Sequence, residues 1–410
     1  MADILGFTSI ALVSVITILT GLRWPAVSRI IYVALSVRVL ILLIGHYITP
    51  LPDSTKDAVG LDNLAWSYGK DGFINSLSYY QGLNSYFYSW VIGVIYSLFG
   101  RSILISQSLS LLFGVGSVFL VWWLAKKIWD DRTAIKVGWV VALFPSLILY
   151  SVLPLREVYS SFFLLVAAYG IFNWTKTSSN YSIVLAISGY IGAAFFHGPL
   201  ILGGIVFLFI ILLSALKKLF KSLIFLRLNL QSFIIIILGL SFMLAFVSNE
   251  IYIPKLGYFD EINLGYFLSE SKARMIGNAS YSEILQIKSN TDFLYKVPLR
   301  VLYFLFSPFP WNIEKPIHII GVVDSFLYMF LVYLIFLNRK IILKDPFLRI
   351  ILLILVCYFF MFAIGVSNFG AGIRHRSKFT IEMVLLVGPL IPKIIFLYKN
   401  KLRRILKDKL

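Results

Sequence analysis

The 410-residue chain has few of the groups on which soluble enzymes and secreted proteins depend. Only 14% of its residues are charged, and it contains one cysteine and four histidines. The single cysteine, Cys357, cannot form an intramolecular disulfide, so the fold needs no oxidising compartment. Four scattered histidines and one cysteine predict no metal site. A Gly-Lys-Ser/Thr phosphate loop is also missing, which argues against a nucleotide-driven pump.

Hydrophobic residues make up 59% of the chain instead. Soluble proteins of this size do not have such a composition. A net charge of +18 would indicate nucleic-acid binding in a soluble protein, but here the basic residues cluster in short links between apolar runs. That distribution is typical of membrane proteins, whose cytoplasmic links are rich in Lys and Arg, so we expect no nucleic-acid partner.

About eleven apolar stretches approach the roughly 20 residues that cross ~30 Å of hydrocarbon. The sequence therefore predicts an all-α polytopic membrane protein with about eleven transmembrane helices, in which residues 1–410 form a single transmembrane domain. The approximate limits of the stretches are 4–22, 26–48, 102–125, 135–152, 158–174, 182–197, 198–215, 232–248, 318–337, 347–366 and 379–397.

The basic links predict the orientation of these helices. If the spans are right, the links rich in Lys and Arg and the basic C-terminal tail lie on one side, which the positive-inside rule makes cytoplasmic. The N-terminus is then outside and the C-terminus inside, as an odd number of spans requires. The first run, 4–22, lacks a basic start and a small-residue cleavage site and is interpreted as a retained helix. We expect residence in a bacterial cytoplasmic (inner) membrane.

Two long segments, 49–101 and 249–317, fall on the outer side in this topology. Each contains an apolar piece, 86–99 and 301–311, that is rich in aromatic residues and too short or interrupted to span. Such pieces favour the membrane interface, so we expect interfacial helices in these outer segments.

The first outer segment opens with a helical pattern that carries a carboxylate. In PDSTKDAVGLDNLAW, residues 52–66, Leu61, Leu64 and Ala65 recur at helical spacing after Asp57. This spacing predicts a short amphipathic helix with Asp57 in its first turn, near the membrane surface. A carboxylate at a dry interface can act as a general base, so Asp57 is a candidate to remove a proton from an acceptor hydroxyl.

Asp53 precedes Asp57 by four residues and lies on the same face if the helix extends that far. It is a candidate for substrate binding. The structural alternative is that Asp53 or Ser54 caps the helix and Asp57 complements the helix dipole.

A tight outer turn, LPLREVY at 153–159, carries Arg156 and Glu157. A guanidinium and a carboxylate that face the same outer cavity as Asp57 would suit a charged substrate. The alternative is a solvated turn whose long side chains extend to the interface.

The last outer loop, GAGIRHRSK at 370–378, breaks the positive-inside rule because it places Arg374, His375, Arg376 and Lys378 on the side that should be poor in positive charge. Guanidinium groups bind phosphate oxygens in pairs, and the glycines allow close approach of the backbone to a ligand. We therefore predict a phosphate or pyrophosphate site; the alternative, binding of lipid headgroups, is also phosphate recognition.

Two further ionisable residues are weaker candidates. His197, at an outer helix-helix turn, could bind substrate, although a lone histidine in such a place is more often structural. Asp324 lies inside an apolar run, where it either has a function or pairs with a neighbouring helix.

Several of these features resemble the GT-C superfamily of membrane glycosyltransferases, in particular bacterial members similar to protein O-mannosyltransferases and aminoarabinose transferases. Those proteins carry an acidic residue in the first outer loop, an aromatic or apolar residue four positions on and an alanine eight positions on. Asp57, Leu61 and Ala65 fit that spacing, with Leu61 in place of the more usual tyrosine. A second acidic residue in the next outer turn is also typical, and Glu157 occupies that position.

Other pieces add to the resemblance. The stretch 86–114 looks like the interfacial helix, Phe-Gly turn and following span of the family, and 304–311 and 374–376 look like segments of members that act in surface glycan assembly. The match covers about the N-terminal half of the chain. It implies a GT-C-like fold.

The resemblance implies an inverting transfer of a sugar or oligosaccharide from a polyprenyl phosphate or pyrophosphate to an acceptor hydroxyl, outside the cytoplasmic membrane. Asp57 would be the base, Glu157 would position acceptor or donor, and Arg374 and Arg376, with His375, would hold the leaving phosphate, whose growing charge cations stabilise. The implied partners are a polyprenyl-linked donor, a glycan or lipid-linked acceptor, and membrane lipids. This scheme requires no cofactor and leaves the use of a divalent metal open.

Two other functions are compatible with the sequence. A polysaccharide or O-antigen polymerase would use the same chemistry on lipid-linked repeat units. A flippase or transporter of lipid-linked glycans would also be basic and polytopic, but such proteins commonly show related halves and charged helices near the midplane, whereas the ionisable groups here gather at the outer side.

Overall fold

The computed structural model describes residues 2–82, 86–224, 230–250, 252, 257–261, 265, 280–313 and 317–392. Within these ranges the chain is almost entirely helical, and Ser280 forms an isolated antiparallel β-bridge with Asn368. Much of the second long outer segment and the end of the last expected span, 393–397, lie outside the described residues, as does the basic tail.

Seven described helices are long and apolar enough to cross a membrane. Each coincides with one of the stretches expected from the sequence, so an all-α, multi-pass membrane protein is confirmed at this level. These helices are α1 (Ala2–Arg23), α2 (Pro25–Tyr47), α6 (Ile103–Ile128), α9 (Glu157–Thr177), α11 (Ile201–Ile224), α15 (Ile317–Lys344) and α16 (Pro346–Gly365).

The other expected spans are shorter or broken. The stretch 135–152 divides at Phe144 because Pro145, which has no N–H to donate, begins a second helix. The last stretch starts with a short helix followed by a 3-10 turn at Gly388–Leu390. The helices concerned are α7 (Asp131–Leu143), α8 (Pro145–Tyr150), α10 (Asn180–Phe196), α12 (Leu230–Val247) and α18 (Thr380–Val387).

The first of the two long segments, 49–101, folds into three short helices: α3 (Lys56–Gly69), α4 (Phe73–Ser78) and α5 (Phe87–Phe99). Helices α3 and α5 cross closely, since a Cβ added at Gly69 would lie 2.5 Å from the carbonyl oxygen of Gly93. A buried carboxylate fixes the pair: Asp62 accepts from the Tyr96 hydroxyl at 2.5 Å and from Arg101 at 2.6 Å. Helix α3 is therefore held closely against α5 and Arg101.

Buried arginines close the ends of three helices. Arg38 donates to Ala142 O at the end of α7 at 2.8 Å, and Arg300 donates to Ala363 O at the end of α16 at 2.8 Å. Arg376 donates to Leu305 O, at 2.9 Å, in the last turn of α14 (Asn290–Phe306). The last carbonyls of a helix have no partner within it and carry partial negative charge, so a guanidinium satisfies them.

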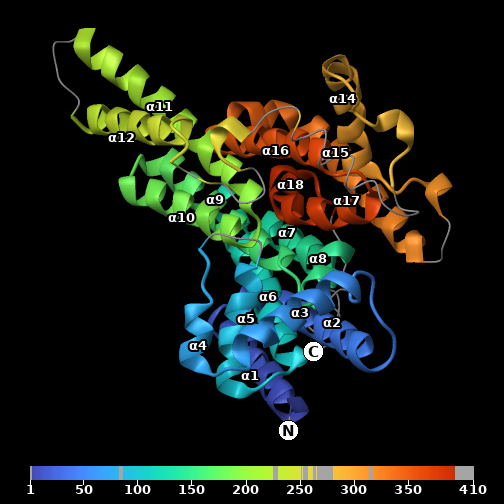
Figure 1. Cartoon of the computed structure of the whole chain (residues 1–410). Coiled ribbons are helices and arrows are strands. Elements are labelled where there is room, and N and C mark those ends of the chain that lie inside the picture. Colours follow the sequence, from blue (N-terminus) through green and yellow to red (C-terminus); the bar gives the residue numbers. More distant parts are fainter. Residues whose placement is uncertain are drawn as a thin grey trace, which may run out of the picture.

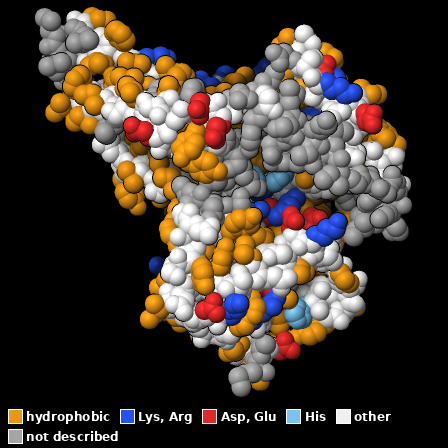
Figure 2. Space-filling model, in the orientation of Figure 1, with side chains coloured by type: hydrophobic (Ala, Val, Ile, Leu, Met, Phe, Trp, Pro, Cys, Tyr) orange, Lys and Arg blue, Asp and Glu red, His pale blue; other side chains and the backbone are white. Residues whose placement is uncertain are grey.

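The C-terminal helices return to the N-terminal half. Figure 1 shows α17 (Phe369–Arg376) and α18 beside α7 and α8, although more than 200 residues separate them along the chain, and contacts of α18 with α7 and α9 agree. Helices α11 and α12 project together from one side. Figure 2 shows hydrophobic side chains over that projection, and acidic, basic and histidine side chains that meet near the middle of the face.

Two glycines of α3 offer a matched test of the α3–α5 crossing. Gly69→Ala should lower the free energy of unfolding by about 1–3 kcal/mol, because the added methyl group meets the Gly93 backbone. Gly60→Ala, where no atom lies within 4 Å, should be neutral or stabilising by ~1 kcal/mol. Thermal unfolding of the purified protein in detergent measures both; equal effects of the two substitutions would contradict the close crossing.

Candidate functional site

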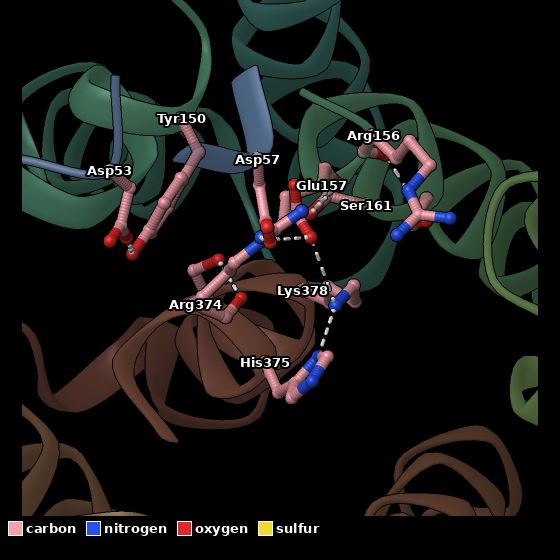
Figure 3. A network of polar contacts seen from close by, with 11 residues as sticks. Asp53, Asp57, Tyr150, Arg156, Glu157, Ser161, Arg374, His375 and Lys378 are labelled. Carbon is pink, nitrogen blue, oxygen red and sulfur yellow. Dashed lines mark hydrogen bonds and ion pairs between the residues drawn. The ribbon is translucent and has the colours of Figure 1, made fainter. Parts of the chain in front are cut away.

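Three segments that are distant in the sequence bring charged side chains together (Figure 3). Asp57 comes from the first turn of α3, Glu157 is the first residue of α9, and Arg374 lies in the last turn of α17. The sequence predicted a helix with Asp57 in its first turn and a functional role for the other two side chains. The structure joins all three in one cluster, which we call the Arg374 cluster.

Arg374 bridges the two carboxylates. Its Nε donates to Glu157 Oε1 at 2.7 Å, and its Nη1 makes a close ion pair with Asp57 Oδ2. The two partners differ in burial: 66% of the Asp57 side chain is exposed, against 3% of the Glu157 side chain. The cluster thus has an anchored end at Glu157 and an open end at Asp57, and Glu157 does not lie in the solvated turn that was the structural alternative.

Burial lowers the pKa of Arg374, but the Glu157 and Asp57 carboxylates raise it by more, so its pKa lies above the ordinary value. Arg374 is therefore a permanent cation at this position. A cation that already holds one exposed carboxylate can exchange it for another anion, such as a phosphate.

The expected loop at 370–378 is wrong in form: residues 369–376 are helix α17, begun by Asn368, whose side chain accepts from Ala371 N at 2.7 Å. Side chains two residues apart on a helix point to nearly opposite sides, whereas those four apart share a face. Arg374 and Lys378 accordingly lie at the cluster and Arg376 does not.

Arg376 instead points into the protein. Its side chain is fully buried, and its Nη2 lies 3.0 Å from Asp324 Oδ2 of α15. Its guanidinium also stacks over Tyr328, 4.5 Å from the ring centroid. Asp324 pairs with a neighbouring helix, which is the second of the two possibilities for this residue. The geometry gives Arg376 a structural place, and does not bring it to the phosphate site predicted for it.

Lys378 and the two histidines extend the cluster (Figure 3). The Lys378 Nζ lies 3.5 Å from Glu157 Oε1 and 2.7 Å from His375 Nδ1. The centroid of the His375 ring lies 5.0 Å from that of His197. His197 directly follows α10, and its ring stacks on Phe362. Both histidines predicted for the site are therefore within one group of side chains.

Asp53 and Arg156 flank the cluster. Asp53 does not continue the helix toward Asp57, because its φ of 60° places it in a turn before α3. It accepts a hydrogen bond from Tyr150 at 2.8 Å. Thr55, the residue directly before α3, makes no capping hydrogen bond with its side chain, so neither Asp53 nor Ser54 is the cap of this helix. Figure 3 shows the Arg156 side chain extending away from Asp57.

An apolar groove shares two helices, α9 and α10, with the residues of the cluster and its neighbour His197. It has a volume of about 600 Å³ and lies between α5, α6, α9 and α10. Its wall includes Tyr159, two residues after Glu157, and Phe196, directly before His197. The Tyr159 and Phe196 rings stack 4.8 Å apart. We call it the aromatic groove; its apolar wall is suited to a hydrocarbon chain.

Sequence reasoning missed Tyr150 and the aromatic groove. Tyr150 stands near the end of an apolar run, where a tyrosine is ordinary, and only the fold places it against Asp53. The groove is built from residues of four helices, and none of these helices carries a pattern that distinguishes lipid-facing from groove-facing aromatic residues.

Comparison of the chain with protein-family models, with curated proteins and with solved structures gives no match. The resemblance to GT-C glycosyltransferases therefore stays a prediction. The part of the chain that the structure describes contains no group of three or more His, Cys, Asp and Glu side chains that could hold a metal ion.

The unequal burial of the two carboxylates predicts unequal effects on stability. Arg374→Met should cost about 3 kcal/mol, because it removes the hydrogen-bonded partner of the buried Glu157 charge and leaves it with Lys378, at 3.5 Å, and the charge of Arg156. Asp57→Asn should cost less than about 1 kcal/mol, since Asp57 is exposed. In thermal unfolding, Glu157→Gln should restore part of the stability that Arg374→Met loses; a double variant no more stable than the single one would show that charge pairing is not what Arg374 contributes.

Proposed function

We propose that this protein is an integral membrane glycosyltransferase of the GT-C type, which transfers a sugar or oligosaccharide from a polyprenyl phosphate or pyrophosphate donor to an acceptor hydroxyl. The observations that carry the proposal are the Arg374 cluster and the aromatic groove, which share the first turn of α9: Glu157 belongs to the cluster and Tyr159 to the groove. A cation that can exchange its exposed carboxylate partner, together with an apolar groove, suits a ligand with an anionic head and an apolar tail.

The proposed reaction assigns a separate task to each end of the cluster. The donor phosphate displaces Asp57 from Arg374, and Asp57 becomes free to act as a base. The acceptor oxygen then bonds to the anomeric carbon as its proton passes to Asp57, and the bond from that carbon to the phosphate oxygen breaks. Arg374 stabilises the leaving anion, and Glu157 holds Arg374 throughout. Attack opposite the leaving group inverts the anomeric configuration.

The topology proposed for this activity has eleven crossings. To the seven long helices it adds α7 with α8, α10, α12 and the segment that begins with α18. With the N-terminus outside and the C-terminus in the cytoplasm of a bacterium, α3, the start of α9 and α17 all face the outer side of the inner membrane. The reaction then occurs where lipid-linked glycans for the cell surface are used.

Transfer from labelled polyprenyl-linked glycans, measured with the purified protein in lipid nanodiscs, tests the proposal. Wild type should form product, and Asp57→Asn should lose at least about 100-fold in rate while remaining folded, because it lacks the base. Product length separates a single transfer from polymerisation. An active wild type matched by Asp57→Asn would refute the base assignment, and labelled glycans that cross the bilayer without reacting would favour the flippase.

The aromatic groove allows a second test with a matched control on one helix. Ile191→Trp fills the groove and should raise KM about tenfold for donors with long polyprenyl chains, but not for short-chain donors. Val184→Trp, seven residues earlier on α10 and 62% exposed, lies outside the groove and should leave KM unchanged. Equal effects on long and short donors would place the hydrocarbon chain elsewhere.

A further inference from the structure

Glu382 is a buried carboxyl group that the proposed reaction does not use. It lies in the first turn of α18, and 5% of its surface is exposed. Both carboxyl oxygens are buried and have no hydrogen-bond partner in the part of the chain that the structure describes. Figure 1 shows α18 between α16 and α7, and α18 also contacts α9 and α15. Water therefore does not solvate these oxygens.

The tyrosines beside Glu382 do not neutralise a charge there. Tyr190 of α10 and Tyr358 of α16 are buried, and their hydroxyls interact electrostatically with the Glu382 carboxyl group. The Tyr358 hydroxyl donates to Leu200 O and accepts from Gly203 N, so it is engaged elsewhere. A tyrosine is neutral and supplies no positive charge to a carboxylate.

The charged groups on the helices around α18 are also engaged elsewhere. Those on α7, α9, α15 and α16 are exposed at helix ends or bound to another group. The bound ones are Lys136 with Ile391 O at 2.7 Å, Glu157 with Arg374 at 2.7 Å, and Asp324 with Arg376 at 3.0 Å, while the Tyr328 hydroxyl pairs with Thr380. Among the described residues, none of these cations forms an ion pair with Glu382.

A carboxylate with no cation, donor or water around it is far less stable than the neutral acid. Hydrocarbon around the bundle cannot supply the missing stabilisation. A neutral acid without a hydrogen bond also costs free energy, but much less than an unpaired charge. We infer that Glu382 is a proton-binding site in the helix core: its side chain is held as a neutral carboxylic acid, and release of the proton loosens the packing of α18 against α16.

The position of Glu382 links this proton to the Arg374 cluster without depending on the proposed function. Helix α18 directly follows the 3-10 turn η5 (Ser377–Phe379), which follows α17 with Arg374. Phe379 stacks on Tyr358 with 4.9 Å between ring centroids. A charge on Glu382 would favour entry of water into this packing and would displace the segment that carries Arg374. The site is thus a pH-sensitive element directly behind the cluster.

Infrared spectroscopy of the protein in lipid measures the proton directly. At about pH 7, well above the ordinary glutamate pKa of about 4.3, wild type should show the C=O stretching band of a protonated carboxyl group, and Glu382→Gln should lose it. Asp292→Asn is the matched control and should leave the band unchanged. Asp292 is similarly buried, at 7% exposed, but it pairs with Lys296 at 3.0 Å and accepts from Lys288 N at 2.8 Å. Absence of the band in wild type, or its persistence in Glu382→Gln, would overturn the inference.

The pH dependence of stability gives a second test with a definite sign. Above about pH 4.3, unfolding exposes Glu382 to water and releases its proton, so the folded state binds one proton more than the unfolded state and its stability falls as the pH rises. Glu382→Gln has the same shape and stays neutral. Its thermal unfolding midpoint should exceed that of wild type by about 5 °C at pH 7, and the difference should disappear near pH 4.

Asp292→Asn should instead have a lower midpoint than wild type at pH 7, because it removes a paired carboxylate. A Glu382→Gln midpoint below that of wild type at pH 7, or a difference that does not change with pH, would show that Glu382 is ionised and stabilised in the folded protein. Neither measurement requires glycan transfer, so failure of the proposed function and failure of this inference are separate results.

Discussion

The burial of guanidinium groups is the constraint on which the part of the structure around the Arg374 cluster depends. A charged side chain withdrawn from water is costly unless its donors are satisfied. Arg38, Arg300 and Arg376 meet this requirement with the carbonyl oxygens at the ends of α7, α16 and α14. The same contacts satisfy helix-end carbonyls that have no partner within their own helices, at positions where the arginines are buried from solvent. At each of these helix ends, one set of hydrogen bonds satisfies both the guanidinium donors and the last carbonyl oxygens of the helix.

Arg374 differs from these arginines, and the difference defines the site. Its hydrogen bonds go to two carboxylates and not to backbone carbonyls, and one of those carboxylates is largely exposed. Backbone carbonyls at a helix end are fixed in place, whereas an exposed carboxylate can be displaced by another anion. The side chains that frame Arg374 are held by buried contacts: Glu157 by burial at the start of α9, and α17 by the bond of Arg376 to the end of α14. The result is a cation with one fixed partner and one exchangeable partner.

Much of this arrangement could be predicted from the sequence, and what could not has a physical reason. Hydrophobic run length and basic links predicted the long helices, and the spacing of Leu61 and Ala65 predicted α3 with Asp57 in its first turn. The sequence predicted that Arg374 and Arg376 lie at the same phosphate site, because the segment was interpreted as a loop. The structure places only Arg374 at the cluster, and Arg376 pairs with Asp324. Short helices such as α17 leave little periodic signal, and a change from loop to helix reverses which side chains share a face. Contacts between distant segments, such as Tyr150 with Asp53, depend on tertiary packing and leave no local pattern.

The position of the polar cluster relative to the aromatic groove follows from the packing of α9 against α10. A Cβ at Gly170 would lie 2.4 Å from Ala186 N, and a Cβ at Gly189 would lie 2.5 Å from Ala167 N, so the two backbones touch at two levels. Helices that approach so closely cannot slide or rotate against each other without a clash. Glu157 and Tyr159 are fixed on one helix of this pair, and Phe196 and His197 end the other. The packing of α9 against α10 therefore fixes Glu157 of the cluster and its neighbour His197 relative to Tyr159 and Phe196 of the groove, and the small residues of the two helices set the register between them.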